Sequence, residues 1–291
     1  MSKADRNRRQ SARERIAAQQ AAARKAESRR RMLIAGGSTV VVLVIVVVLI
    51  VIKLSSSSPS DAGAGSPSGT ALPAKVAAQI TSVPASTLAK VGAGATVSGS
   101  IKAVTDTPLT SNGKPEVLYI GAEFCPFCAT ERWAMAVALS RFGTFSPLHG
   151  IHSSATDTPA SIPTVTFYKS TYTSKYLTFT PVETTEVDKS KTLQTPTSAQ
   201  SALWTKYTQQ GIPFVDFGNK YVVSGASYSY QVLQGKTWAQ IAGDLQDPGT
   251  DIAQGADGAA NQLTAAICKL TGNQPATVCA TPLITSLQAK L

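Results

Sequence analysis

The sequence predicts an α/β domain that is preceded by one transmembrane helix. Three observations lead to this fold class. An apolar strand pattern runs directly into a helix pattern around Cys125 and Cys128, further strand and helix patterns follow toward the C-terminus, and an uncharged apolar run occupies residues 33–52. Strands that alternate with helical segments bury their apolar faces by packing in layers, so the pattern indicates helices packed on a sheet.

The N-terminal region combines a basic tail with an apolar run. Residues 1–32 contain eleven Lys and Arg against three Asp and Glu, a net charge of +8, whereas the whole chain has a net charge of +10. Residues 33–52 are uncharged and rich in Val, Ile and Leu, and twenty such residues are enough to cross a bilayer as a helix. Because basic residues flank the cytoplasmic side of a span, we expect a cytoplasmic N-terminus and an extracytoplasmic C-terminal domain.

Two other interpretations of this region fit it less well. A cleaved signal peptide has a shorter basic region, an apolar core of about seven to fifteen residues and a small-residue cleavage site, none of which matches residues 1–52. A nucleic-acid-binding arm would also be basic, but the position directly before an apolar span favours topology and anionic lipid as the reason for the charge. We therefore expect an uncleaved single-pass anchor in the cell membrane and no nucleic-acid partner.

The remainder of the chain divides into a linker and one domain. Residues 53–74 contain a tract of Ser, Gly, Pro and Ala that cannot bury a core, which predicts a flexible linker. Residues 75–291 are long enough for one domain with its own core and show no internal repeat. After Lys53 the chain holds fifteen basic and fourteen acidic residues, so this domain is nearly neutral.

Within residues 75–291 the elements are expected in the following order. A helix or loop at 76–88 leads into a strand at 96–101, and an active-site strand at 116–122 precedes a helix at 129–142. The later elements share apolar patterns bounded by turn residues. They are strands at 148–153 and 164–168, a strand at 176–180 that forms a hairpin with 164–168, a helix at 198–209, antiparallel strands at 214–217 and 221–224, and helices at 236–245 and 258–270.

Cys125 and Cys128 form a C-x-x-C motif where the predicted strand meets the predicted helix. Unpaired backbone N–H groups and the helix dipole favour an anion there, so a thiol loses its proton more readily than in a free cysteine. We expect Cys125 to attack a disulfide as a thiolate and Cys128 to resolve the mixed disulfide. Pro126 suits the first helical turn, and Phe127 offers an apolar surface beside the sulfur for a partner chain.

Two alternatives for this motif remain open at the level of sequence. The motif could be half of a zinc site completed by His149 and His152, although a spacing of three on a strand points these side chains to opposite faces. It could also be a purely structural disulfide. The strand and helix context favours redox chemistry with no metal, and no cofactor motif is found.

The run from Ala122 to Cys128, Ala-Glu-Phe-Cys-Pro-Phe-Cys, resembles the active-site segment of the thioredoxin superfamily, whose members typically read A-E-[WF]-C-x-x-C. The segment Gly-Ile-Pro-Phe-Val-Asp-Phe at 211–217 resembles the one in which that family places a cis-proline before a strand. The resemblance implies a central mixed sheet flanked by helices, with Pro213 across from the dithiol and the Ile212 backbone paired with the bound substrate. It also implies an insertion before the cis-proline strand, since the interval from Ser153 to Pro213 is longer than a minimal thioredoxin needs.

More of the chain, roughly residues 75–291, resembles thioredoxin-like proteins of actinobacteria and archaea that are grouped as a domain of unknown function. The segments 151–154, 164–176 and 267–272 carry this likeness. One departure from thioredoxin is that Tyr119 stands where the family has a buried acid, six residues before the attacking cysteine. This departure disfavours a reductase.

Cys268 and Cys279 form a second pair, separated by a turn-forming loop. In an oxidising compartment we expect a structural disulfide between them, and an electron relay to Cys125 and Cys128 is the alternative. Several further side chains are ambiguous. Glu123 is either a proton acceptor or a solvated charge, Asp216 either influences the dithiol or faces solvent, and the others are more typical of packing than of a substrate platform: Trp133, Trp204, Tyr168, Tyr172, Tyr176, Tyr228 and Tyr230.

Together these features predict a membrane-anchored thiol-disulfide oxidoreductase, closer to an oxidase or isomerase than to a reductase. Its expected partners are cysteine-containing secreted or envelope proteins and a membrane redox partner. The alternative is a non-catalytic binding module of the cell envelope, in which both cysteine pairs are structural disulfides.

Overall fold

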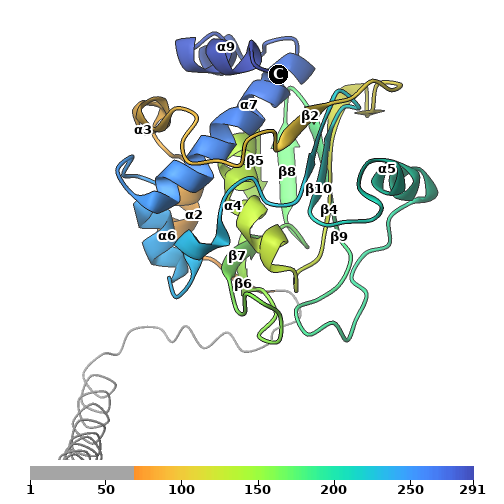
Figure 1. Ribbon diagram of the computed structural model, residues 1–291, viewed down its shortest axis with the longest axis vertical. Helices are drawn as coiled ribbons and strands as arrows, with labels where there is room; N and C mark the ends of the chain where they lie inside the picture. Colours follow the sequence, from red (N-terminus) through yellow and green to blue (C-terminus); the bar gives the residue numbers. More distant parts are fainter. Residues whose placement is uncertain (1–68) are drawn as a thin grey trace, which may run out of the picture. The chain divides into compact units, whose positions relative to one another are not determined.

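The computed structural model describes residues 69–291, which belong to one compact unit (Figure 1). The predicted basic tail at 1–32, the predicted span at 33–52 and most of the predicted linker at 53–74 lie outside the described residues. Among residues 69–291, no helix is both long and apolar enough to cross a bilayer.

A mixed sheet forms the centre of the unit. Strand β4 (Lys114–Gly121) pairs in parallel with β9 (Thr178–Glu183) and antiparallel with β10 (Phe214–Phe217). Strand β11 (Tyr221–Ser224) follows β10 and pairs with β2 (Ile101–Ala103), while β3 (Thr110–Ser111) pairs with the start of β4. The active-site strand is therefore an interior strand, which agrees with its nearly continuous apolar sequence.

Helices cover both faces of this sheet. Residues 117–120 of β4 are fully buried, and they alternate between two apolar clusters because successive side chains of a strand point to opposite faces. One face packs against α4 (Pro126–Ser140) and α7 (Gly258–Leu270), and α5 (Ser198–Thr208) packs its Leu203 and Trp204 against the other. The chain thus folds as a mixed α/β domain, as its patterns predict (Figure 1).

The hairpin of β10 and β11 forms as expected from the sequence. Phe214 pairs with Ser224 and Phe217 with Tyr221. The connection has three residues. Its first two, Gly218 and Asn219, both have positive φ, at 65° and 57°, and the Lys220 backbone N–H donates to the Phe217 carbonyl at 3.1 Å. A turn of this kind needs positive φ at both central positions, which glycine and asparagine adopt most readily.

Two expected elements in the N-terminal part of the domain differ from the structure. The lead-in segment at 76–88 is not one helix but two, α2 (Ala74–Thr81) and α3 (Ala85–Val91), because Pro84 interrupts the first and directly precedes the second. The strand expected at 96–101 begins only at Ile101, where its backbone can pair with Val223 of β11.

The strands between β6 (His149–His152) and α5 pair differently from the sequence prediction. Strand β7 (Pro163–Thr166) pairs with β6, and β8 (Thr171–Ser174) pairs with β5 (Gly143–Ser146). The predicted hairpin of 176–180 with 164–168 is wrong, because β9 lies parallel to β4 in the central sheet. The partner of β9 lies more than fifty residues earlier in the chain, so the local apolar pattern does not reveal this pairing.

Helices close the C-terminal part of the fold. Helix α6 (Trp238–Asp244) begins at a capping box in which the Thr237 hydroxyl and the Gln240 side chain bond each other's backbone N–H. Helix α7 follows a π-helical segment, Ala253–Asp257, and covers the sheet beside α4. The chain ends with the short helices α8 (Ala276–Cys279) and α9 (Pro282–Gln288).

Candidate active site

The structure places Cys125 and Cys128 where β4 runs into α4. Cys125 is the N-cap residue of α4, and its Sγ accepts a hydrogen bond of 3.3 Å from the backbone N–H of Cys128. Pro126 takes the first helical position, as expected, where no backbone N–H is needed. Cys125 is 5% exposed and Cys128 is fully buried, and their sulfurs are not bonded to each other. Both cysteines are therefore buried, and of the two only Cys125 keeps a small exposed fraction.

The two thiols have different electrostatic surroundings. The hydrogen bond from the Cys128 thiol lowers the pKa of Cys125 to about 7 against the effect of burial, and the backbone N–H groups of Cys128 and Phe127 and the charge of Arg132 assist. Burial raises the pKa of Cys128 well above its usual value. Near neutral pH, the negative charge therefore resides on Cys125, the more accessible sulfur.

The expected substrate-contacting residues gather around Cys125. Ile212 packs against the two cysteines, and the bond between Ile212 and Pro213 is cis, as the family resemblance implies. Phe127 is 44% exposed, and its ring lies 6.0 Å from that of Tyr230 in an edge-to-face contact. The surface beside the dithiol is consequently apolar and aromatic.

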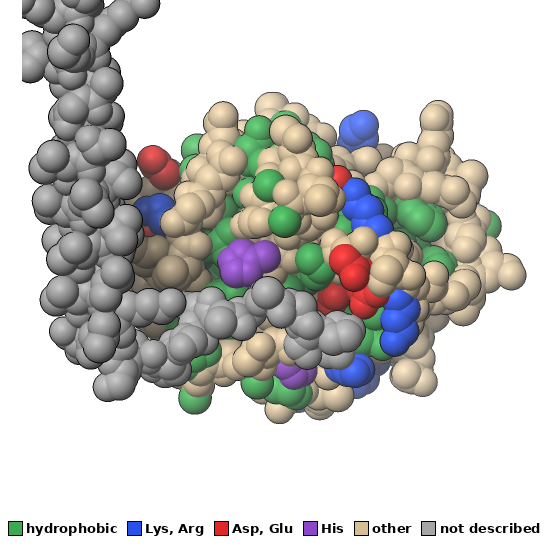
Figure 2. All heavy atoms as spheres, turned by 90° about the horizontal axis from the view of Figure 1, so that it is seen from below, with side chains coloured by type: hydrophobic (Ala, Val, Ile, Leu, Met, Phe, Trp, Pro, Cys, Tyr) green, Lys and Arg blue, Asp and Glu red, His purple; other side chains and the backbone are tan. Residues whose placement is uncertain are grey.

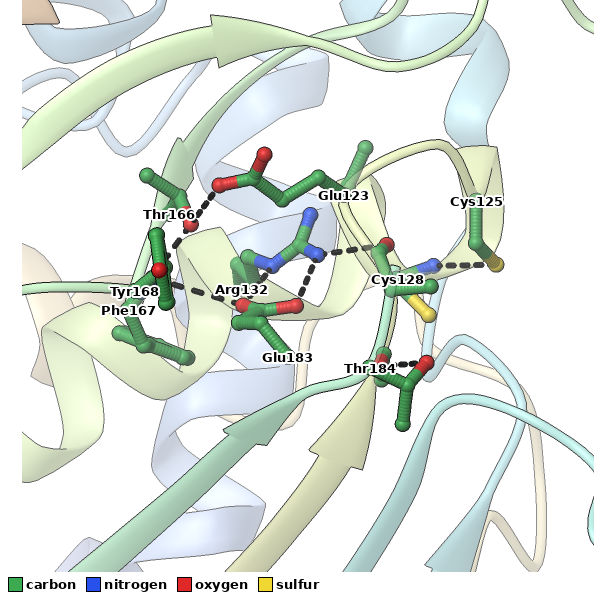
Figure 3. A network of polar contacts seen from close by, with 12 residues as sticks. Glu123, Cys125, Cys128, Arg132, Thr166, Phe167, Tyr168, Glu183 and Thr184 are labelled. Atoms are coloured by element: carbon green, nitrogen blue, oxygen red, sulfur yellow. Dashed lines mark hydrogen bonds and ion pairs between the residues drawn. The ribbon is translucent and has the colours of Figure 1, made fainter. Parts of the chain in front are cut away.

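A buried polar network adjoins the dithiol (Figure 3). Arg132 lies one helical turn after Cys128 and donates from Nε and Nη2 to the two carboxylate oxygens of Glu183, at 2.8 and 2.7 Å. Its Nη2 also donates to the Ala122 carbonyl at 2.7 Å. Burial works against the charge, yet the Glu183 carboxylate holds the pKa of Arg132 well above its usual value. An ion pair therefore lies inside the domain, next to the C-x-x-C motif.

Glu123 belongs to the same network and is not a solvated charge. It is fully buried, accepts a hydrogen bond of 2.7 Å from the Thr166 hydroxyl, and has a second carboxylate oxygen without a partner among the described residues. Burial raises the pKa of Glu123 to about 7. In Figure 3 its carboxyl group points toward Thr166 and away from the two sulfurs, so it is not placed to take a proton from either one directly.

Residues 100–269 match the model of one protein family, which is described as a domain of unknown function (DUF929). This match covers more than half of the chain. The chain belongs to this family. The comparison with curated proteins and the comparison with solved structures each returned no match.

The DUF929 region contains the dithiol and every residue of the buried network, from Glu123 to Glu183. It also contains Cys268 but ends before Cys279. These two cysteines form the expected disulfide, which joins α7 to α8 with Cα atoms 5.5 Å apart. The electron relay to the dithiol stays an untested alternative.

Two functional candidates of the DUF929 domain escaped the sequence reasoning. Arg132 and Glu183 are both fully buried, although charged side chains are usually expected at the surface. Arg132 could have been found from its position four residues after Cys128, because residues at that spacing share a helix face. Glu183 had no local signal, since only the pairing of β9 with β4 brings it to Arg132.

Other predicted candidates lie elsewhere in the DUF929 domain. Asp216 is fully buried, accepts from the Asn219 backbone N–H at 2.6 Å, and has its pKa raised to about 6 by burial, so it neither faces solvent nor adjoins the dithiol. Trp133 is a core residue whose indole N–H donates to the Pro163 carbonyl, and Trp204 of α5 is partly buried against the sheet. Of the tyrosines, Tyr230 lies beside Phe127, whereas Tyr228 is buried in the core.

Neither histidine joins the cysteines. His149 and His152 lie at the two ends of β6, and the His152 ring packs 4.5 Å from that of Trp238. Within residues 69–291, no group of three or more His, Cys, Asp or Glu side chains is arranged to hold a metal ion. The face shown in Figure 2 has acidic and basic side chains close to one another and beside hydrophobic ones. This face therefore has mixed polarity.

Proposed function

We propose that this protein is a membrane-anchored, extracytoplasmic thiol-disulfide oxidoreductase of the oxidase or isomerase type. The observation that carries the proposal is the asymmetry of the dithiol. Cys125 caps a helix, keeps 5% of its surface exposed and has its pKa lowered to about 7, while Cys128 is fully buried and has a raised pKa. Such an arrangement provides one nucleophile or leaving group and one resolving thiol.

The proposal includes a thioredoxin-like fold for the domain. It is supported by the mixed sheet flanked by helices, by the C-x-x-C motif between β4 and α4, and by Pro213, which directly precedes the strand paired with β4. The residue before that proline, Ile212, packs against the cluster that contains both cysteines. A client segment bound there would lie across Cys125.

Oxidation of a client would proceed in two exchanges. A client thiolate attacks Sγ of Cys125 in the Cys125–Cys128 disulfide, forming a mixed disulfide and releasing Cys128, which takes up a proton. A second client thiolate then attacks the client sulfur, and Cys125 leaves as a thiolate. The client has lost two electrons to the dithiol, and a disulfide-bearing membrane redox partner must accept them to restore the disulfide. A thiolate stabilised at Cys125 is a good leaving group in the second exchange, which favours oxidation.

The location and clients follow from the N-terminal sequence. The apolar run at 33–52 after a tail of net charge +8 supports an anchor with its C-terminal domain outside the cytoplasm. In that compartment, cysteine-containing secreted or envelope proteins are the available substrates.

A non-catalytic binding module is the second candidate. The burial of both cysteines favours it, because a structural disulfide does not have to be accessible to a client. The exposed Phe127 would then be a binding residue. The two candidates differ in what the cysteines do during a reaction, which can be measured.

The deciding experiment combines trapping with a reduction potential, both on the purified full chain. In the oxidoreductase, the Cys125 thiolate of Cys128→Ser attacks a disulfide of a scrambled cysteine-containing protein, releases one client thiolate, and stays in the mixed disulfide because no resolving thiol is present. The matched Cys125→Ser variant, whose remaining sulfur is fully buried, traps none. A reduction potential near −120 mV would indicate a disulfide donor, and one near −270 mV a reductase. A pair that stays oxidised below about −300 mV, together with no trapped species in either variant, would establish the binding module instead.

A further inference from the structure

The exchange reaction uses the two sulfurs but leaves the buried Arg132–Glu183 pair without a role. Both side chains are fully buried, with their charged atoms 2.7 Å apart. Taking an ion pair out of water costs several kcal/mol, and an apolar pair of similar size is often equally stable or more stable. Stability is therefore a weak explanation for this pair, and its position relative to the dithiol is the more informative property.

One backbone carbonyl links the pair to the attacking cysteine. The Ala122 carbonyl accepts a hydrogen bond from Arg132 Nη2 at 2.7 Å and another from the Cys125 backbone N–H at 3.2 Å. Ala122 also packs directly against both cysteines. The guanidinium thus holds the loop between β4 and α4 in the position that sets the Cys125 sulfur at the helix N-terminus. Figure 3 shows the guanidinium between the Glu183 carboxylate and the cysteines.

The groups around the Arg132 guanidinium determine how strongly its positive charge can favour a thiolate. Tyr119, which faces the guanidinium with its ring centroid 5.9 Å away, is neutral because burial raises its pKa well above the usual value. Glu183 is bound by Arg132 through both carboxylate oxygens, while the Nη1 group of Arg132 has no hydrogen-bond partner among the described residues. In a medium of low dielectric constant, a positive group close to a sulfur stabilises its anion more strongly than it would in water.

We propose that Arg132 is a positioning residue that makes this dithiol oxidising. Held by Glu183, its guanidinium keeps a positive charge against the Ala122 carbonyl and so stabilises the reduced, negatively charged form of the cysteine pair. This inference rests on the proposed function and deepens it, since it identifies the groups that bias the direction of electron flow.

The electron balance gives the sign of the effect. Reduction of the Cys125–Cys128 disulfide takes two electrons and leaves one sulfur as a thiolate near neutral pH, with the other protonated. A positive charge beside the thiolate stabilises only the reduced side of this equilibrium, which raises the reduction potential. Removing the charge must lower the potential, and removing its counter-ion must raise it.

The test is the reduction potential of the Cys125–Cys128 pair in the full chain, measured against glutathione for four single variants and one double variant. Arg132→Gln should lower the equilibrium constant for client oxidation about tenfold, which is a shift of about 30 mV toward a more reducing potential. Glu183→Gln should shift the potential in the opposite direction. Arg132→Lys, which keeps the charge but not the planar fork, should shift less than Arg132→Gln, and the Arg132→Gln/Glu183→Gln double variant should lie between the two single ones.

Glu131→Gln is the matched control. Glu131 is the neighbouring residue of the same helix and is equally buried, but its carboxylate accepts from the Ser227 hydroxyl and backbone N–H and does not contact the network of Arg132. It should leave the potential unchanged. A purely structural role of the ion pair predicts one of two results. Either Arg132→Gln and Glu183→Gln both shift the reduction potential in the same direction, or neither shifts it more than Glu131→Gln does. Each of these results would overturn the inference.

The outcomes also separate this inference from the proposed function. If the wild-type dithiol does not exchange with glutathione and traps no client, the oxidoreductase itself is refuted. If the wild type exchanges normally and the two variants fail to shift in opposite directions, only the role of Arg132 is refuted. If Arg132→Gln does not fold, the other two variants still test the inference. Glu183→Gln should raise the reduction potential above that of the wild type, and Arg132→Lys should lower it.

Discussion

Cys125 and Cys128 lie in the first turn of a long helix that follows a buried strand, whereas Cys268 and Cys279 join the end of α7 to the short helix α8. The first pair has backbone N–H groups and a cationic side chain near it, and Cys125 keeps 5% of its surface exposed. The second pair is buried among apolar residues of the main core and is bonded. The two pairs thus differ in their surroundings, because only the first has groups that stabilise a thiolate.

The largest expected effect is on catalysis. Cys125→Ser should reduce disulfide exchange to the uncatalysed rate, because it removes the accessible sulfur. The Cys268→Ser/Cys279→Ser double variant should keep the wild-type rate at a temperature where it is folded. Oxidative refolding of a reduced cysteine-containing protein measures both. If both variants lost activity equally, the two cysteine pairs would not differ in their contribution to catalysis. That result would support an electron relay between the pairs.

The second effect concerns stability. Breaking the Cys268–Cys279 disulfide, which closes a loop of 11 residues, should lower the free energy of unfolding by about 3 kcal/mol. Denaturant unfolding of the Cys268→Ser/Cys279→Ser variant and the wild type checks this value. The difference should vanish when the wild type is unfolded under strongly reducing conditions, and a persistent difference would point to packing in place of the crosslink.

The third effect is the difference in thiol reactivity within the dithiol. In the reduced protein, Cys125 should reach half of its maximal alkylation rate near pH 7, since its pKa is lowered from the usual 9.0 to about 7. Mass spectrometry of iodoacetamide-treated protein follows both sites. Cys128 should stay unmodified over the same range, and simultaneous modification of both sites would contradict the asymmetry.

The fourth effect is a loss of stability as pH rises. Burial raises the pKa of Glu131 to about 7, so the folded state keeps a proton there that the unfolded state releases near its usual pKa of 4.5. Between about pH 4.5 and 7 the folded state binds more protons than the unfolded state, and stability should fall with a slope of up to about 1.4 kcal/mol per pH unit from this group. Glu131→Gln should flatten that part of the profile, and an unchanged profile would exclude Glu131 as its source.

The smallest expected effect is at the client surface. Phe127→Ala should weaken client binding by about 1 kcal/mol, because it removes half-exposed aromatic area next to Cys125. The ratio of exchange rates with a folding protein and with glutathione measures this effect, since glutathione is too small to use the surface fully. Val97→Ala, which truncates the other exposed large hydrophobic residue of the described domain, is the control. An equal change in both variants would show that the Phe127 surface is not specific.

Much of the fold followed from local patterns. The active-site strand and helix, the hairpin turned by Gly218 and Asn219, and the helix at 258–270 lie close to their predicted limits, because each has a periodic apolar pattern and a recognisable turn or cap. The predicted hairpin of 176–180 failed because a strand's neighbour is decided by long-range pairing. The contact of Arg132 with Glu183 could not be predicted for the same reason, because it also depends on long-range strand pairing.

By itself, the amino-acid sequence determined the C-x-x-C motif, the proline before the partner strand and the second cysteine pair, because each depends on residues close together in the chain. Only the tertiary structure decided what surrounds the sulfurs. The parallel pairing of β9 with β4 brings Glu183 to Arg132 across 51 residues of sequence, and the packing of the domain buries Glu123. Charges interact through space in an interior of low dielectric constant, so their effect on a thiol depends on distances that no local sequence pattern contains.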